Sequence, residues 1–262
     1  MLFRSALPDM TDLLSFALQL ADTADAIALR HFEAQDFVVE CKPDRSEVTV
    51  ADRGTEEAIV TAIGARYPDH SIFGEEFGIQ GGTSEWQWII DPIDGTANYV
   101  RGVPVWATLI ALRKSGVLQL GVVSAPALHR RWWASRGHGS YRNGVAIGVS
   151  KVLHVADAFI SYSDGDWSDT EMRARLGELL DQCHRQRGLG DFWQHVLVAE
   201  GALDIAIEPV VSLWDLAAIQ IVVEEAGGRF SDLDGVARPD GGNALSTNAL
   251  LHDIVLTALH GA

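Results

Sequence analysis

The sequence predicts a mixed protein, α+β in its first part and α/β in its last part, on three observations. Apolar residues recur at helical spacing near the start of the chain. Short apolar runs separated by Gly and Pro follow in the middle, and strand-like and helical segments alternate toward the end. We therefore expect two halves, residues 1–150 and 151–262, that share one cleft.

The first half is predicted to begin with two helices and to continue with strands. Helical spacing runs from Asp12 to Phe32 and again from Thr49 to Tyr67, where Pro68 follows. The apolar run from Trp86 to Ile90 ends at an Asp-Pro pair, as a buried strand does. Three further runs predict an antiparallel sheet: Trp106 to Leu112, Val117 to Ser124, and Arg131 to Ala134.

The second half is predicted to alternate between the two element types. Strands are expected at Ala158 to Tyr162, at Leu203 to Ile207, and in short pieces at Arg229-Phe230 and Ala244-Leu245. Helices are expected at Thr170 to Arg185, Phe192 to Glu200, Leu213 to Ala226 and Asn248 to Leu259.

The composition excludes several classes of partner. Of 262 residues, 47% are hydrophobic, which is enough for a sizeable core, and 20 basic against 36 acidic residues give a net charge of −16. Such a charge repels nucleic acid and anionic membrane, and it would repel a phosphate substrate unless cations lie in the site. Two cysteines, Cys41 and Cys183, no membrane-length apolar run and no signal peptide favour a cytoplasmic protein with free thiols.

The segment from Trp88 to Thr96, WIIDPIDGT, carries the strongest chemical indication. A buried strand would end at Asp91, and a tight turn through Pro92 would point Asp94 into the same pocket. Two adjacent carboxylates repel each other unless a cation lies between them, and oxygen ligands select Mg2+, Mn2+ or Ca2+ over zinc. Free N–H groups at Gly95 and Thr96 would suit a phosphate.

Two further carboxylates end or begin predicted elements. Glu75 follows the short apolar run from Ser71 to Phe73, and Asp215 lies near the start of the apolar helix from Leu213 to Ala226. Taken alone, each has a structural alternative. Glu75 would be a solvated turn residue, and Asp215 would cap a helix.

Together these segments resemble the inositol monophosphatase superfamily of Mg2+-dependent, lithium-sensitive phosphatases. The resemblance runs from about Leu13 to Leu259 and is carried by four motifs in order. They are VTVAD ending at Asp52, GEE around Glu75, WIIDPIDGT, and WDLAA from Trp214. The resemblance implies a layered αβαβα fold and a cytoplasmic homodimer that hydrolyses a small phosphorylated metabolite.

The resemblance also implies a set of metal ligands. It assigns metal binding to Glu75, to Asp91 as a bridge between two ions, and to the backbone carbonyl of Ile93. It assigns binding of the second metal to Asp94 and Asp215. Two to three Mg2+ ions are expected, Mn2+ is an alternative, and Li+ is an expected inhibitor.

Other roles implied by the resemblance concern water and phosphate. Thr96 and Asp52 match the pair that, with Glu75, helps to deprotonate the attacking water. The N–H groups of Gly95 and Thr96 would hold the phosphate, with Asp94 beside it. Lys42 matches a basic residue near this site, although a plain surface lysine is an equal alternative.

The substrate is indicated by carboxylates and by longer stretches. Glu208 has the spacing from Asp215 of a substrate-binding glutamate, and Asp191 adds a second carboxylate, unless it only caps the helix that follows. Such a pair suits an ammonium or imidazolium better than a neutral ring. The stretches RGVPVW and RRWW resemble the histidinol-phosphate phosphatases of this superfamily, which release L-histidinol and phosphate in histidine biosynthesis.

The sequence alone leaves two alternatives open. Within the same class, the chain would be an inositol-1-phosphate phosphatase or a related small-metabolite phosphatase. From a different class, it would be a metal-binding regulator that has kept the fold and lost catalysis, which the intact acidic motifs disfavour.

Overall fold

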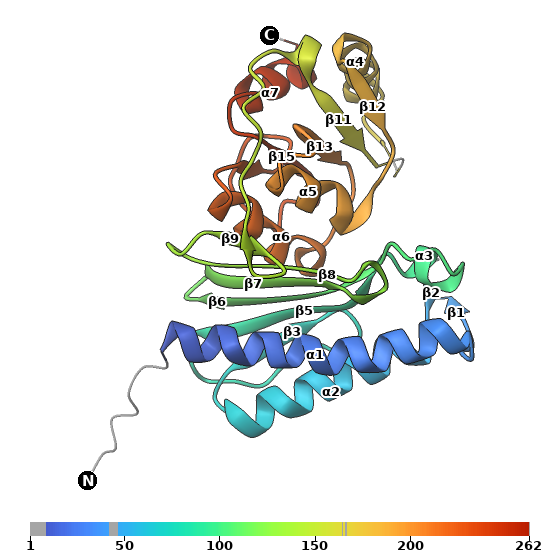
Figure 1. Ribbon diagram of the computed structural model, residues 1–262, viewed down its shortest axis with the longest axis vertical. Coiled ribbons are helices and arrows are strands. Elements are labelled where there is room, and N and C mark those ends of the chain that lie inside the picture. Colours follow the sequence, from blue (N-terminus) through green and yellow to red (C-terminus); the bar gives the residue numbers. More distant parts are fainter. Residues whose placement is uncertain (1–8, 42–46, 164, 166, 262) are drawn as a thin grey trace.

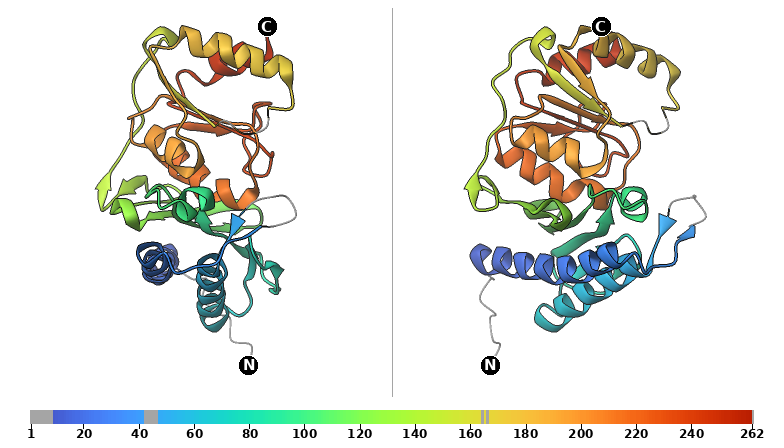
Figure 2. Two further views of the ribbon diagram at one scale, coloured as in Figure 1. Left: turned by 90° about the vertical axis from the view of Figure 1, so that its right-hand side faces the viewer. Right: turned by 45° about the vertical axis from the view of Figure 1, so that its right-hand side comes forward.

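The computed structural model describes residues 9–41, 47–163, 165 and 167–261, which form five stacked layers (Figure 1). The predicted αβαβα order is confirmed, and two turned views show the same succession (Figure 2). The helices, in layer order, are α1 (Met10–Ala34) and α2 (Val50–Arg66), then α5 (Asp191–Ala199) and α6 (Leu213–Glu225), then α4 (Thr170–Gln182) and α7 (His252–His260).

The second layer is an eight-stranded sheet with the order β10-β9-β8-β7-β6-β5-β3-β4. Neighbouring strands are antiparallel, except that β3 and β5 are parallel. The strands are β3 (Ser71–Gly74), β4 (Gly78–Gln80), β5 (Trp86–Asp94), β6 (Ala107–Lys114), β7 (Val117–Ala125), β8 (Arg130–Ser135), β9 (Ser140–Arg142) and β10 (Val145–Ala146).

This sheet separates two hydrophobic clusters. Alternate residues of β5 show the division, because Trp88 and Ile90 pack with α1 and α2, whereas Ile89 packs with α5 and α6. Such alternation follows from the strand period of two residues. The helix α6 is apolar around its whole circumference, since it lies between the two sheets and has no broad solvent face.

The fourth layer is a five-stranded sheet with the order β12-β11-β13-β15-β14. Its strands are β11 (Phe159–Tyr162), β12 (Arg185–Arg187), β13 (Ile205–Glu208), β14 (Arg229–Ser231) and β15 (Ala244–Thr247). The pairs β11–β12 and β11–β13 are parallel, and β15 is antiparallel to both of its neighbours. Its outer face packs on α4 and α7.

The sequence predicted the long elements and the short strands β14 and β15, but it missed several other short elements. The strand predicted to end at Ile90 continues to Asp94, and β12 lies where a helix was expected to end at Arg185. Also unpredicted are two 3-10 turns, η1 (Pro126–Leu128) and η2 (Val155–Asp157), and the β1 (Glu40–Cys41) and β2 (Glu47–Val48) pair. The helix α3 (Thr96–Val100) begins where Gly95 and Thr96 were expected to open a turn or helix. The division into halves at residue 150 stays a prediction.

Two smaller expectations concern cysteines and membranes. Cys41 and Cys183 are both free thiols, as predicted. Within the described part of the chain, every helix is too short or too polar to span a bilayer.

Candidate active site

The parallel pairing of β3 and β5 places two of the predicted carboxylates side by side. Gly74 lies opposite Ile90 in this pairing, so both strands reach the same edge of the sheet with Glu75 and Asp91 next in line. The amide of Glu75 donates to the carbonyl of Ile90 at 3.1 Å and continues the ladder. The position of Glu75 is therefore set by sheet register.

A β-bulge in β5 brings Asp94 to the same side as Asp91. Asp91 pairs with Leu109 and Asp94 with Ala107, so β5 has one residue more than β6 across this interval. Residues three apart on a regular strand point to opposite faces, and an extra residue cancels that alternation. The Thr108 hydroxyl donates to the carbonyl of Pro92 at 2.8 Å and holds the bulge.

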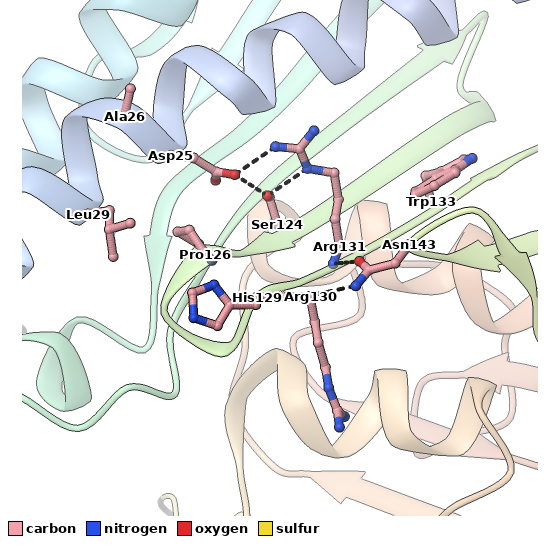
Figure 3. Close-up of a pocket in the computed structure, with 10 residues that line it drawn as sticks. All are labelled: Asp25, Ala26, Leu29, Ser124, Pro126, His129, Arg130, Arg131, Trp133 and Asn143. Carbon is pink, nitrogen blue, oxygen red and sulfur yellow. Dashed lines mark hydrogen bonds and ion pairs between the residues drawn. The ribbon is translucent and has the colours of Figure 1, made fainter.

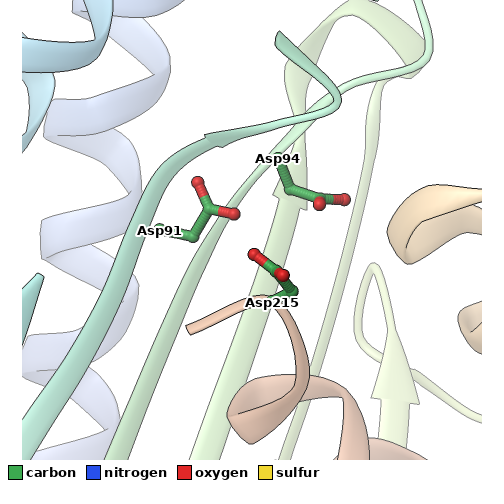
Figure 4. A group of neighbouring side chains, drawn as sticks. All are labelled: Asp91, Asp94 and Asp215. Carbon is green, nitrogen blue, oxygen red and sulfur yellow. The ribbon is translucent and has the colours of Figure 1, made fainter. Parts of the chain in front are cut away.

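The third carboxylate is positioned by a helix start in the other half of the chain. Asp215 is the third residue of α6, and its Oδ2 accepts the backbone N–H of Ser212 at 2.6 Å, as in a capping box. The structural alternative for Asp215, a first-turn capping residue, is therefore observed, and its role as a metal ligand stays a prediction. One carboxylate oxygen from each of Asp91, Asp94 and Asp215 lies within 4.8 Å of the other two, and the three side chains point toward one another (Figure 4).

The electrostatics of this group are those of crowded, buried acids. Burial, and then the charge of Glu75, raises the pKa of Asp91 well above its ordinary value. Burial and the charge of Asp191 do the same to the pKa of Asp94, against the N–H of Phe192, which donates to Asp94 Oδ2 at 2.7 Å. Burial chiefly raises the pKa of Asp215 to about 7.

These residues fit a hard divalent cation. All donors of the group are carboxylate oxygens, and the charges nearest to them are other carboxylates. Buried ions of one sign need an opposite charge, and an oxygen-only site favours Mg2+ or Mn2+. Glu75 lies outside the 4.8 Å group, although its charge raises the pKa values of Asp91 and Asp215.

The predicted Thr96–Asp52 pair is present with a long contact. Thr96 Oγ1 lies 3.4 Å from Asp52 Oδ1 and 2.9 Å from the carbonyl oxygen of Ile93, so the hydroxyl bonds mainly to Ile93. Asp52 caps α2, because its Oδ2 accepts from the amide and hydroxyl of Thr49 at 2.8 and 2.7 Å. Burial chiefly raises the pKa of Asp52 to about 6.

Two cavities meet at Asp191. One, of about 130 Å³, is lined by Asp94, Asp215 and Glu208 among others. The other, of about 570 Å³, is lined by Glu75, Gly95 and Thr96 and by further residues of α3. Asp191 lines both cavities, so the structure brings the predicted substrate carboxylates next to the predicted metal ligands.

Asp191 does not have the conformation of a helix cap. The N-cap of α5 is Gly190, and Asp191 is the first helical residue, with a left-handed φ of 50°. Its Oδ2 accepts from Asn98 Nδ2 at 3.0 Å, and Asn98 also donates to the carbonyl of Val105 at 2.9 Å. At Gly95, with φ of 80°, a Cβ would lie 3.3 Å from this same oxygen of Asp191.

Sequence reasoning missed three residues around the site, and one predicted residue lies elsewhere. Asn98 and Arg101 both line the larger cavity. The buried Glu56 accepts the N–H groups of Glu76 and Phe77 at 2.8 and 3.0 Å and holds the turn after β3. Its place one helical turn after Asp52 was a usable indication. Lys42 lies outside the described residues.

A separate hollow of about 550 Å³ lies between α1 and β7 and β8 (Figure 3). Across it, Arg131 donates to Asp25 Oδ2 at 2.6 Å and to Ser124 Oγ at 2.9 Å. These bonds join α1 to the large sheet. The predicted site residues among the described part of the chain do not line this hollow.

Comparisons with known proteins identify the family of the chain. Residues 9–260 match the profile of the inositol monophosphatase family. A histidinol-phosphatase of Mycobacterium tuberculosis is 51% identical over 95% of this chain and 98% of its own length. A histidinol-phosphatase of Streptomyces coelicolor is 47% identical over 97% of this chain and 99% of its own.

Solved structures show the same fold. The extragenic suppressor protein suhB of Bartonella henselae superposes with a TM-score of 0.88 at 27% identity, over 94% of this chain and 98% of its own. An IMPase of Thermotoga maritima superposes with a TM-score of 0.86 at 31% identity, over 95% of this chain and 97% of its own.

Proposed function

The chain belongs to the inositol monophosphatase family, and we propose from this membership that it is a Mg2+-dependent histidinol-phosphatase. The observation that carries the proposal is the group of buried Asp91 and Asp94 with half-buried Asp215, in a chain about as long as two histidinol-phosphatases that it matches throughout. The reaction would convert histidinol phosphate and water to L-histidinol and phosphate. A homodimer and a cytoplasmic location belong to the same proposal.

The metal ligands in this proposal are Glu75, Asp91, the Ile93 carbonyl, Asp94 and Asp215. The number of ions, two to three, and the inhibition by Li+ are part of it. Bound Mg2+ would lower the pKa of a water molecule. It would also stabilise the negative charge on the phosphate and on the leaving oxygen. The protein residues hold these carboxylates in place before substrate arrives, through sheet register, the bulge and the α6 cap.

Proton transfer in this proposal is assigned to Asp52 through Thr96, with Glu75 beside them. A base works best when its pKa lies near the working pH, and the pKa of Asp52, raised by burial to about 6, meets that condition. In the structure the Thr96 hydroxyl bonds mainly to Ile93, so this relay requires it to turn toward Asp52. The N–H groups of Gly95 and Thr96 would hold the phosphate.

The organic end of the substrate is assigned to Asp191 and Glu208. Both carboxylates line the cavity that also contains Asp94 and Asp215. Histidinol phosphate carries an ammonium and an imidazole, which such carboxylates attract, whereas inositol phosphate offers only hydroxyls. Asn98 fixes one of the two carboxylates from the opposite half.

Phosphate release from a panel of substrates tests the proposal. With Mg2+ present, kcat/KM for histidinol phosphate should exceed that for inositol 1-phosphate, fructose bisphosphate and adenosine bisphosphate by about tenfold or more. EDTA should stop turnover, and Mg2+ or Mn2+ should restore it. A tenfold preference for inositol phosphate would replace the substrate assignment with the second candidate, and no turnover with Mg2+ would favour a regulator.

A further inference from the structure

A chain of three buried, hydrogen-bonded side chains includes Glu208, which lines the small cavity. His195 Nε2 lies 3.0 Å from Glu208 Oε2, and His195 Nδ1 lies 2.8 Å from Ser246 Oγ. The exposed fractions are 0% for both His195 and Ser246 and 6% for Glu208. The three residues come from α5, β15 and β13, so tertiary packing assembles the chain.

The hydrogen-bond directions along this chain are set by its chemistry. A carboxylate only accepts, so His195 Nε2 carries the proton that it donates to Glu208. The Ser246 hydroxyl has His195 Nδ1 as its partner among the described residues, and a buried hydroxyl needs an acceptor. With Glu208 as the carboxylate, the His195 ring donates from Nε2 to Glu208 and accepts at Nδ1 from Ser246.

Both donors to Glu208 bind the same oxygen. Besides His195, Gln194 Nε2 lies 3.3 Å from Glu208 Oε2. Within the described chain, Oε1 is therefore the oxygen left for a ligand, and Glu208 itself lines the cavity of about 130 Å³. His195 is not among the residues that line this cavity.

We infer that His195 is a positioning residue for substrate selection, which holds the Glu208 carboxylate oriented toward a cationic group of the substrate. This inference rests on the proposed function, since it takes Glu208 as a substrate contact. A carboxylate fixed at one oxygen loses little side-chain freedom when it binds an ammonium or imidazolium. A substrate without such a cation gains little from that fixation.

The test compares His195→Phe with His195→Gln in the Mg2+-loaded enzyme. Phe removes both hydrogen bonds of the ring, whereas Gln carries an N–H of similar reach to Nε2. For His195→Phe, we expect KM for histidinol phosphate to rise about tenfold or more and kcat to change less. The kcat/KM ratio of histidinol phosphate over p-nitrophenyl phosphate should fall by about the same factor, and His195→Gln should recover most of it.

The matched control is His252→Phe. His252 is equally buried and bonds two hydroxyls, Ser231 Oγ at 2.9 Å and Thr247 Oγ1 at 3.0 Å, which are its ring's hydrogen-bond partners within the described residues. Its loss should lower Tm and leave the substrate ratio unchanged. An equal loss for both substrates in His195→Phe, or a Gln variant no better than Phe, would overturn the inference.

Two further measurements keep the outcomes separate. Should His195→Phe fail to fold, Ser246→Ala removes the donor to Nδ1, and we expect the substrate ratio to fall at least about twofold. An unchanged ratio there counts against the inference. A failure of the proposed function is seen earlier, as absent turnover of histidinol phosphate by the wild-type enzyme, whereas a failure of the inference is confined to the variants.

Discussion

The structural role of Asp94, which is to accept one backbone hydrogen bond, does not require its charge. Oδ2 accepts the backbone N–H of Phe192 at 2.7 Å, and this bond joins β5 to the start of α5. An asparagine side chain offers a carbonyl oxygen at the same place, so the bond can persist without the charge. The charge itself is disfavoured by burial and by Asp191.

Asp94→Asn should therefore fold normally and lose activity. We expect kcat/KM to fall by more than about a hundredfold. Loss of a residue that only hydrogen-bonds a metal ligand already costs about 10- to 100-fold, and Asp94 is itself a proposed metal ligand. Phosphate release in Mg2+ and thermal melts in EDTA are the two measurements. Near-normal turnover, or collapse of the metal-free fold, would contradict this account.

At the scale of elements, α6 is held close to β7 by a residue without a side chain. A Cβ at Gly121 would lie 2.6 Å from the carbonyl oxygen of Ala218 and 2.6 Å from Ile221 Cγ2. Glycine therefore lets the helix and strand approach closely. Because α6 carries Asp215, this contact also sets the distance between Asp215 and the β5 carboxylates.

Gly121→Ala should push α6 away from the sheet. We expect a loss of about 1–3 kcal/mol in the free energy of unfolding together with a fall in kcat. Gly64→Ala, on an exposed turn of α2 with no atom within 4 Å, is the control and should stabilise by up to about 1 kcal/mol. Urea unfolding and phosphate release measure both, and equal behaviour of the two variants would count against the argument.

Elements with regular periodicity could be predicted from the sequence, and positions that depend on a partner could not. The helix α1 follows from apolar residues at helical spacing, and α6 follows from an apolar run that stops at two glycines. The bulge in β5 could not be predicted, because it depends on pairing with β6. The parallel pairing of β3 with β5 could not be predicted either, although Glu75 itself was predicted as a site residue.

The site shows the same division. The metal carboxylates were predicted together through the family motifs, and the structure brings Asp91, Asp94 and Asp215 together. Their individual roles stay predictions. The Asn98–Asp191 bond joins residues 93 positions apart, and no local pattern indicates it. The His195–Glu208 contact, 13 positions apart, depends on how α5 packs on β13.

For the whole molecule, the buried and mutually repelling carboxylates of the site lower the stability of the metal-free fold, and a bound cation would offset this cost. Asp215 has a pKa near 3.8 in an unfolded chain and about 7 in the metal-free fold, chiefly through burial. Because the folded pKa is the higher one, the folded state holds this proton more tightly. The metal-free fold therefore loses stability as pH rises from about 4 to about 7, and the full loss is present above that range.

In EDTA, Asp215→Asn should melt above the wild type at about pH 8, by about 3 °C or more, and the difference should vanish near pH 4. With Mg2+ at about pH 8 the order should reverse, because only the wild type binds the metal fully. Asp181→Asn, at an exposed position on α4, is the control and should show no such pH dependence. A pH-independent difference for Asp215→Asn would refute the linkage.

The capping boxes of α2 and α6 have a consequence for how these positions tolerate change. Asp52 and Asp215 each accept the amide that opens their own helix, and each is assigned to the chemistry as well. Alanine would fray the helix, asparagine would remove the charge, and glutamate would carry the charge one methylene too far. Selection for folding and selection for turnover therefore act on the same two codons. Almost every substitution there would be selected against.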